Sequence, residues 1–271
     1  MNLDALDKEI IRKSIQLTFI KATKEDKLQM NHQMTPDTIA YLIAYFIGEI
    51  KKDKTEKLHV SDLAAGKGNL LNIVVAHLTS RGNEVTAEAV DNDDLLISVA
   101  ANSGALLGFS EKIHYTHSDI LQELLIAPSD IVVSDFPIGY YPVNERAKNY
   151  QTAFPEGNSF AHFLMFEQNV NYLKESGWGI FIVPSDIFET DKSSVLMGWL
   201  KENVHIQAFL SLPVDLFHKN GMKKSIIIVQ KIGEKSLQAE QVLLGEIPDL
   251  KNAQKMQSFL DIFHNWSAKM I

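Results

Sequence analysis

The sequence predicts an α/β fold with a mostly parallel, seven-stranded sheet, helices on both faces and a terminal antiparallel hairpin. From residue 58 onward, apolar strand-like runs alternate with helix-length segments, and crossovers of that length join parallel strands. Only residues 213–222, which offer a loop or a short turn, separate the last two strand-like runs. Those two strands are therefore expected to form the hairpin.

Two helices are expected before the sheet. Residues 2–20 carry apolar side chains at roughly helical spacing, and the polar residues 21–31 resemble a linker. The second helix, residues 35–50, opens with Thr35 as N-cap and Pro36 in the first helical position. We expect residues 1–30 to form an N-terminal helical extension.

The core is expected over residues 31–232. Its strands are predicted at residues 58–63, 84–90, 113–116, 131–134, 178–183, 205–210 and 225–231, and its helices at 69–79, 93–107, 159–174 and 192–201. Residues 233–271 resemble a strand and a helix (252–266) added on the outside as a C-terminal appendage.

Composition narrows the class of protein. A chain of 271 residues with 45% hydrophobic content can bury one large core, and the absence of cysteine excludes disulfides and thiolate metal sites. The net charge of −8 argues against a general nucleic-acid coat or a membrane-surface protein, although a local basic groove stays open. Without a secretory pattern or a long apolar stretch, we expect a cytoplasmic protein with no membrane contact.

The segment SDLAAGKG, residues 61–68, closes a strand and opens a helix. Backbone N–H groups at such a helix start can bind the carboxylate or ribose of a nucleotide-like ligand. The D-x-x-x-G-x-G pattern is typical of S-adenosylmethionine sites, and Leu71 replaces the third glycine of the dinucleotide fingerprint. The alternative is a purely structural role, in which the glycines only turn the strand into the helix. The cofactor-binding residues expected here are Asp62, Ala64, Ala65, Gly66, Gly68 and Asn69.

Two further acids follow the next two strands. Asp91, with Asn92 beside it, lies where a carboxylate can reach ribose hydroxyls across adjacent strands, and it can also cap the following helix. Asp119 can accept a hydrogen bond from an adenine amino group while Ile120 packs on the ring. Its alternative role is a cap for a short helix at residues 120–126.

The segment SDFPIGYYP, residues 134–142, ends the fourth strand, where doubly wound sheets bind ligands. A planar amino group can donate to Asp135 Oδ and to the Phe136 carbonyl, and Pro137 stiffens the loop. These acceptors favour a pyramidal nitrogen, which can attack the sulfonium methyl group in line without a metal or a covalent nucleophile. The alternative is an ordinary Pro/Gly loop.

In their order, these motifs resemble the N6-adenine DNA methyltransferases of class I, a Rossmann-like fold. The modification subunits of type I restriction systems and their stand-alone bacterial relatives are the best match, over about residues 30–232. The segment NHQMTP, residues 31–36, resembles the part that touches the donor's methionine end, which implies donor contacts from Met34, Thr35 and Pro36. Asp135 to Ile138 match the family's (Asn/Asp)-Pro-Pro-(Phe/Tyr), which implies donor contacts from Asp135 and Pro137 as well.

Two departures from the family pattern affect the acceptor. Phe136 replaces the first proline, and Ile138 replaces the aromatic that stacks on a flipped base, a contact worth roughly 1–3 kcal/mol. Either Tyr140 or Tyr141 substitutes for it, or the acceptor is not a base in duplex DNA. The loop at residues 139–158 carries aromatics and cations that suit a stacked base beside a phosphate, or that simply pack the loop.

The resemblance implies S-adenosylmethionine as cofactor, S-adenosylhomocysteine as product and adenine N6 in nucleic acid as the leading acceptor. The alternatives are a protein amide, an RNA base, or a degenerate donor-binding or assembly module. An NAD-linked oxidoreductase is disfavoured by Leu71 and the hairpin. Because no separate recognition domain is found, a recognition subunit supplied in trans or a homodimer is expected. His114 and His117 lack a third ligand, so no metal is expected, and the Lys51–Lys57 and Lys219–Lys224 clusters are interpreted as solvated surface.

Overall fold

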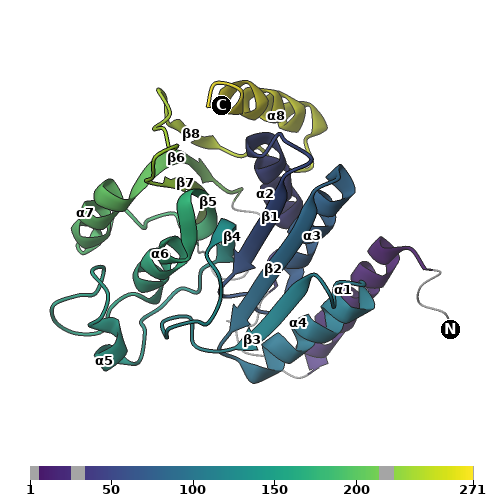
Figure 1. Ribbon diagram of the computed structural model, residues 1–271, viewed down its shortest axis with the longest axis horizontal. Coiled ribbons are helices and arrows are strands. Elements are labelled where there is room, and N and C mark those ends of the chain that lie inside the picture. Colours follow the sequence, from purple (N-terminus) through teal and green to yellow (C-terminus); the bar gives the residue numbers. More distant parts are fainter. Residues whose placement is uncertain (1–5, 26–33, 214–222, 271) are drawn as a thin grey trace.

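The computed structural model describes residues 6–25, 34–213 and 223–270, and it has the predicted α/β architecture (Figure 1). The described strands are β1 (Lys57–Asp62), β2 (Glu84–Asp91), β3 (Ile113–His117), β4 (Ser129–Asp135), β5 (Leu173–Pro184), β6 (Val204–Ser211), β7 (Lys224–Lys231) and β8 (Leu243–Glu246). The helices are α1 (Lys8–Glu25), α2 (Asp37–Ile50), α3 (Asn69–Arg81), α4 (Asp94–Leu106), α5 (Asn144–Ala147), α6 (Ala161–Asn171), α7 (Ser193–Asn203) and α8 (Ala253–Ser267).

The strand order in the sheet is β3-β2-β1-β4-β5-β7-β6-β8. Strands β1 to β5 run parallel, and β7 is antiparallel to both β5 and β6. The chain therefore builds outward from β1 to β3 and returns to place β4 on the other side of β1. Ligands of open α/β sheets bind at this change of direction, outside the carboxyl ends of the strands.

Three expectations about individual elements need correction. Thr35 is not the N-cap of the second helix, because α2 begins at Asp37 with Pro36 in the N-cap position and the Thr35 hydroxyl donates to Asp135 instead. The hairpin of β6 and β7 is confirmed, but the sheet has eight strands rather than seven, because residues 243–246 pair in parallel with β6. The expected linker at residues 21–31 is wrong at its start, since α1 continues to Glu25 through residues that do not break a helix. The remainder of that stretch and residues 214–222, including Lys219, lie outside the described residues.

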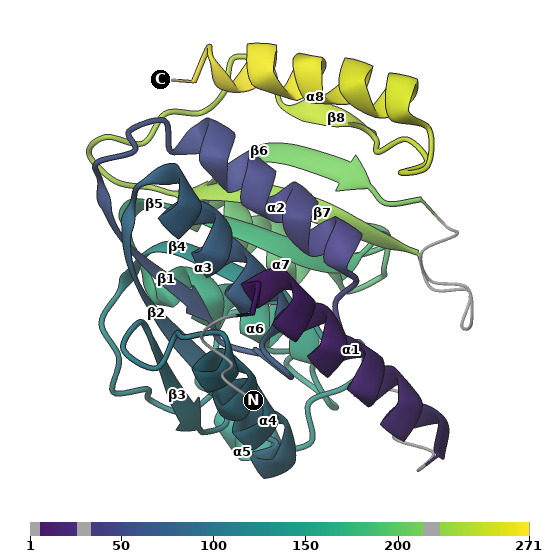
Figure 2. The same ribbon diagram turned by 90° about the vertical axis from the view of Figure 1, so that its right-hand side faces the viewer.

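The central strands are buried on both faces and divide the core into two layers. Ile180, Ile182 and Ile228 face α2, α3 and α8, whereas Phe181 and Val229 face α6 and α7. The division arises because successive side chains along a strand point to opposite faces of the sheet. Figure 2 shows α2 and α3 in front of the sheet with α6 behind it. Packing on both faces fixes the strand ends on which the candidate site depends.

The last helix belongs to the first of these layers. Phe263 of α8 stacks on Phe46 of α2 with ring centroids 4.1 Å apart, and Phe259 also contacts Phe46. Both α8 rings are buried. The C-terminal strand and helix therefore extend the sheet and cover part of its core. No helix in the described ranges is long and apolar enough to cross a bilayer.

Candidate active site

Three acids lie at the carboxyl ends of adjacent strands: Asp62 on β1, Asp91 on β2 and Asp135 on β4. Burial raises the pKa of Asp62 to about 7, and the negative charges of Asp91 and Asp135 add to that shift. Their influence on the pKa of Asp62 agrees with the sheet order, which places the three carboxylates near one another at the edge where a doubly wound sheet has its ligand crevice. The structure thus brings together the strand ends that the sequence singled out.

Asp62 is 2% exposed. Its Oδ1 accepts hydrogen bonds from Ala64 N (3.2 Å) and from Ser134 Oγ (3.1 Å). Within the described ranges it forms no ion pair, and hydrogen bonds offset only part of the desolvation of a buried charge. Its environment suits a cationic ligand group that would complete the charge balance.

The glycine loop, residues 63–68, is hydrogen-bonded to the end of β2. Gly66 N donates to Asp91 Oδ2 at 2.7 Å, and Ala65 N donates to the Val90 carbonyl at 2.9 Å. Asp91 Oδ1 accepts from Asp93 N, and burial raises the pKa of Asp91. Asp91 therefore positions the glycine loop, a role that the sequence did not predict.

The two glycines serve different purposes. Gly66 has φ +53°, and a Cβ added there would meet nothing within 4 Å, so its outer side is open to a ligand. Gly68 has φ +78°, and a Cβ there would lie 3.1 Å from Ala100 Cβ of α4. Gly66 permits close approach from the crevice, whereas Gly68 permits close packing of helices α3 and α4.

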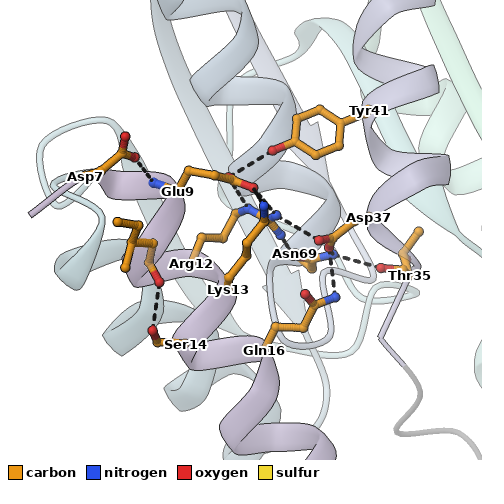
Figure 3. Close-up of polar contacts among 11 residues, drawn as sticks. Asp7, Glu9, Arg12, Lys13, Ser14, Gln16, Thr35, Asp37, Tyr41 and Asn69 are labelled. Carbon is orange, nitrogen blue, oxygen red and sulfur yellow. Dashed lines mark hydrogen bonds and ion pairs between the residues drawn. The ribbon is translucent and has the colours of Figure 1, made fainter.

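Thr35 and Asn69, both expected donor contacts, are joined by a polar cluster shown in Figure 3. Asn69 Nδ2 donates to the Thr35 carbonyl (2.8 Å) and to Asp37 Oδ1 (3.0 Å). Arg12 of α1 binds Asp37 Oδ2 at 2.7 Å and also pairs with Glu9, which lowers the pKa of Glu9 to about 2. Helix α1 therefore secures the starts of α2 and α3 beside the crevice.

Asp119 is occupied by the chain itself. Its Oδ1 accepts from Leu121 N (2.9 Å), and its Oδ2 accepts from Tyr141 Oη (2.6 Å) and Arg146 Nη1. The short helix considered above is absent, because residues 120–122 form a turn and a bend and residues 123–126 have no regular structure. Asp119 thus ties the 139–158 loop to the end of β3, and Arg146 stands at the carboxylate oxygen expected to receive an adenine amino group.

Asp135 is held from two distant parts of the chain. Thr35 Oγ1 donates to its Oδ2 at 3.0 Å, and Lys224 Nζ contacts its Oδ1 at 2.5 Å. The interpretation of Lys224 as solvated surface is wrong, because its side chain is only 17% exposed and pairs with this acid. The predicted hairpin could have indicated that Lys224 lies near this site, because the second strand of the hairpin begins at the edge where β4 and β5 end.

Phe136 turns its side chain away from the crevice. Its ring is fully buried and stacks on Phe181 at 5.1 Å, and its N–H donates to the Ile182 carbonyl at 3.0 Å. This aromatic therefore anchors the peptide of the motif in the core. The Phe136 side chain is therefore not available to a ligand, and the role expected for its backbone carbonyl stays a prediction.

The remaining residues of the motif differ in exposure. Pro137 is exposed and Ile138 is half-buried. Tyr141 is buried and hydrogen-bonded to Asp119, so it does not present a free ring. Tyr140 is 63% exposed and stacks with one face on Phe160 at 5.1 Å. Between the two tyrosines considered, Tyr140 alone offers a ring to an incoming group.

The other predicted cofactor contacts lie around the same loops. Ala64, Met34 and Pro36 are half-buried, Ala65 and Ile120 are buried, and Asn92 is exposed. Asn92 engages His117 through its backbone carbonyl (3.1 Å), and Met34 lines a small cavity with Lys67 and Asn72 under α1. In the 139–158 loop, Tyr150 and Phe154 pack inward, which agrees with the alternative that the aromatics of this loop pack the loop itself.

The crevice fits the donor that the sequence predicts. The open side of Gly66 can admit a ligand, and buried Asp62 suits an ammonium group. A family model described as N-6 DNA Methylase matches residues 17–265. The chain belongs to the N-6 DNA methylase family. It is an S-adenosylmethionine-dependent methyltransferase, and transfer to an exocyclic amino nitrogen, adenine N6, follows from that family.

Individual relatives are similar over nearly the whole chain. Protein YtxK of Bacillus subtilis, itself uncharacterised, is 36% identical over 261 residues, which cover 96% of this chain and 78% of the relative. A solved structure of a candidate class I S-adenosylmethionine-dependent methyltransferase from Listeria monocytogenes has a TM-score of 0.89 and 36% identity, covering 98% of this chain and 81% of that one. The modification subunit of a candidate type I restriction enzyme from Vibrio vulnificus shares the fold, with a TM-score of 0.70 and 13% identity over 98% of this chain and 59% of that one.

Proposed function

We propose that the protein transfers the methyl group of S-adenosylmethionine to N6 of adenine in DNA, in the crevice at the ends of β1, β2 and β4. The observation that carries this proposal is the position of Asp135. It ends β4 beside Asp62 and Asp91, so an amine that donates to Asp135 would lie next to a donor held by the other two acids.

The donor half of the crevice uses the glycine loop and its acids. Asp62 receives the donor's α-ammonium group, since it is a buried carboxylate without an ion pair among the described residues. Asp91 keeps lone pairs for ribose hydroxyls while it holds Gly66. Thr35, held by Asn69, borders the methionine end. The sulfonium supplies an electrophilic methyl carbon.

The acceptor half orients the attacking nitrogen. Asp135 Oδ and the Phe136 carbonyl accept hydrogen bonds from the two N–H groups of the amine. This orientation turns the lone pair of the nitrogen toward the methyl carbon. The new N–C bond forms as the C–S bond breaks, and the nitrogen then releases one proton to solvent. Positioning supplies most of the rate in such a reaction.

Tyr140 takes the place of the aromatic that is missing at Ile138. One face of its ring is backed by Phe160, which in turn stacks on His162 at 5.1 Å. Burial lowers the pKa of His162 to about 4, so this support is neutral at pH 7. A column of three rings presents a rigid outer face on which a base can stack.

We infer that part of the DNA contact comes from a second subunit, either a recognition subunit or another copy of the chain. The motive is the net charge of −8, which gives little general attraction for a polyanion. Light scattering of the protein with and without DNA would test this inference, and a monomer that binds DNA tightly alone would contradict it.

The proposed acceptor is tested by incubating the protein with methyl-labelled donor and unmethylated DNA, RNA or protein. Mass spectrometry of digested DNA should reveal N6-methyladenine, whose rate of formation Asp135→Ala should lower on the order of 100-fold. Label in RNA or in a protein amide would reassign the acceptor. Donor binding without transfer to any of them would favour a donor-binding module. The alternative rests on Ile138, which replaces the aromatic that stacks on a flipped base.

A further inference from the structure

Lys224 reaches the candidate active site because of strand direction. It is the first residue of β7 and pairs with Pro184, the last residue of β5. Because β7 runs antiparallel, its first residue lies at the edge where β4 and β5 end. There Lys224 Nζ lies 2.5 Å from Asp135 Oδ1, with 17% and 19% of the two side chains exposed.

This ion pair differs from a solvated surface pair. Ion pairs at the surface contribute little to stability because water screens both charges. The Asp135–Lys224 pair is mostly buried, so water screens it less and both charges act on neighbouring groups. Thr35 holds the other oxygen of Asp135, so the carboxylate has a donor on each side. Its remaining lone pairs can still accept from an amine.

The charge at this point bears on the reaction. Methyl transfer moves a positive charge from the donor sulfur to the acceptor nitrogen, so the net charge of the group that holds the acceptor affects both the donor and the product. An unpaired Asp135 would add a full negative charge to a crevice that already contains Asp62 and Asp91. The adjacent ammonium offsets that charge.

We propose that Asp135 and Lys224 work as one charge-neutral acceptor unit, with Lys224 as a positioning residue that acts through Asp135. The unit then presents carboxylate oxygens to an amine with the net charge of an amide side chain. This inference rests on the proposed function, because it concerns the same site. It implies that removing either charge alone leaves the crevice unbalanced, and that removing both restores the balance.

Two donor analogues can measure this charge without a known acceptor. Sinefungin carries a primary amine where the donor carries its methyl group, and S-adenosylhomocysteine carries nothing there. The ratio of their dissociation constants, Kd of S-adenosylhomocysteine over Kd of sinefungin, reports the charge facing the methyl position. At pH 8, Lys224→Met should raise this ratio by about fivefold or more, and Asp135→Asn should lower it similarly.

The double variant Asp135→Asn/Lys224→Met should return the ratio to within about twofold of the wild type, and its turnover should exceed that of Asp135→Asn alone. Lys224→Arg, which keeps the charge, should resemble the wild type. Lys223→Met is the matched control, since Lys223 is the exposed neighbour. Lys224→Gln replaces Lys224→Met if the latter unfolds.

The outcomes separate the two claims. If neither analogue binds the wild type, the proposed function fails. If both bind but Lys224→Met and Lys224→Gln leave the ratio within about twofold of the wild type, the charge-neutral unit is refuted while the donor site stands. Turnover in the double variant no higher than in Asp135→Asn would also refute the unit.

Discussion

The donor half and the acceptor half of the crevice are held in different ways. In the donor half, most donors to the acids are backbone N–H groups: Ala64 donates to Asp62, and both Gly66 and Asp93 donate to Asp91, while the Ser134 hydroxyl adds a side-chain donor to Asp62. In the acceptor half, Asp135 is held by side chains from Thr35 and Lys224, 100 and 89 residues away along the chain.

The backbone fixes the acids of the donor half more directly than the acid of the acceptor half. Carboxylates held by backbone N–H groups keep those donors when another side chain nearby is replaced. A carboxylate held by distant side chains depends on the whole sheet and on residues at two other places in the sequence. Variants in the acceptor half should therefore affect turnover, while variants in the donor half should affect affinity for the donor.

Asp135→Ala should have the largest effect. It removes the acceptor for the amine, and loss of one such hydrogen-bonding group at a reacting centre costs on the order of 100-fold in kcat. The dissociation constant for S-adenosylhomocysteine should stay within about threefold, because the donor half keeps its backbone contacts. Single-turnover transfer and calorimetry would measure both quantities, and a parallel loss of donor affinity would break the proposed division.

Asp62 should make donor binding depend on pH. Its pKa is raised to about 7 in the free protein, so it is largely protonated below that pH and must ionise to pair with the donor's ammonium group. Donor affinity should therefore rise by up to about tenfold per pH unit between about pH 5 and 7, then level off.

The control for this pH dependence is Asp62→Asn, which keeps an oxygen for Ala64 N and Ser134 Oγ but does not titrate. Calorimetry at several pH values should give a flat profile for that variant. A slope as steep as in the wild type would assign the dependence to another group, with Asp91 the first candidate because its pKa is also raised.

Arg146→Met should have a smaller effect of the opposite sign. Arg146 occupies Asp119 Oδ2, so its removal frees an acceptor for the adenine amino group, and S-adenosylhomocysteine should bind about two- to fivefold more tightly. Lys148→Met, which removes an exposed charge from the same loop, is the matched control. Weaker binding in Arg146→Met would indicate that the Arg146–Asp119 pair itself shapes the donor pocket.

Tyr141→Phe should have the smallest effect. It removes the 2.6 Å hydrogen bond to Asp119 and should lower the free energy of unfolding by about 1 kcal/mol. Tyr140→Phe, at an exposed ring, should change it by less than about 0.5 kcal/mol. Chemical denaturation would measure both, and equal effects would mean that Tyr141 does not secure the loop.

The donor half could be predicted from the sequence because its signals are local. Asp62 and Asp91 each precede a turn that they cap, and Gly66 and Gly68 have the positive φ that the loop needs. The periodicity that placed the strands is local as well. Such features depend on residues within a few positions of each other, so they can be recognised without the fold.

The contacts that the sequence did not predict join distant segments. The predicted hairpin brings Lys224 to the edge where β4 ends but does not identify Asp135 as its partner, and no residue near Arg146 points to Asp119. Both contacts require the folded sheet. Arg12 is similar, since its partner Asp37 lies on another helix. The eighth strand was expected as a strand, but its partner β6 depends on how the chain returns along the sheet.

The most direct test of the central claim is calorimetric titration of S-adenosylhomocysteine into the wild type, Gly66→Val and Asp135→Ala. A valine at Gly66 would project into open space at φ +53°, beside the crevice. Binding at one site per chain should weaken by tenfold or more in Gly66→Val and persist in Asp135→Ala. Unchanged binding in Gly66→Val, with Gly198→Ala of α7 as control, would contradict the assignment of the donor site.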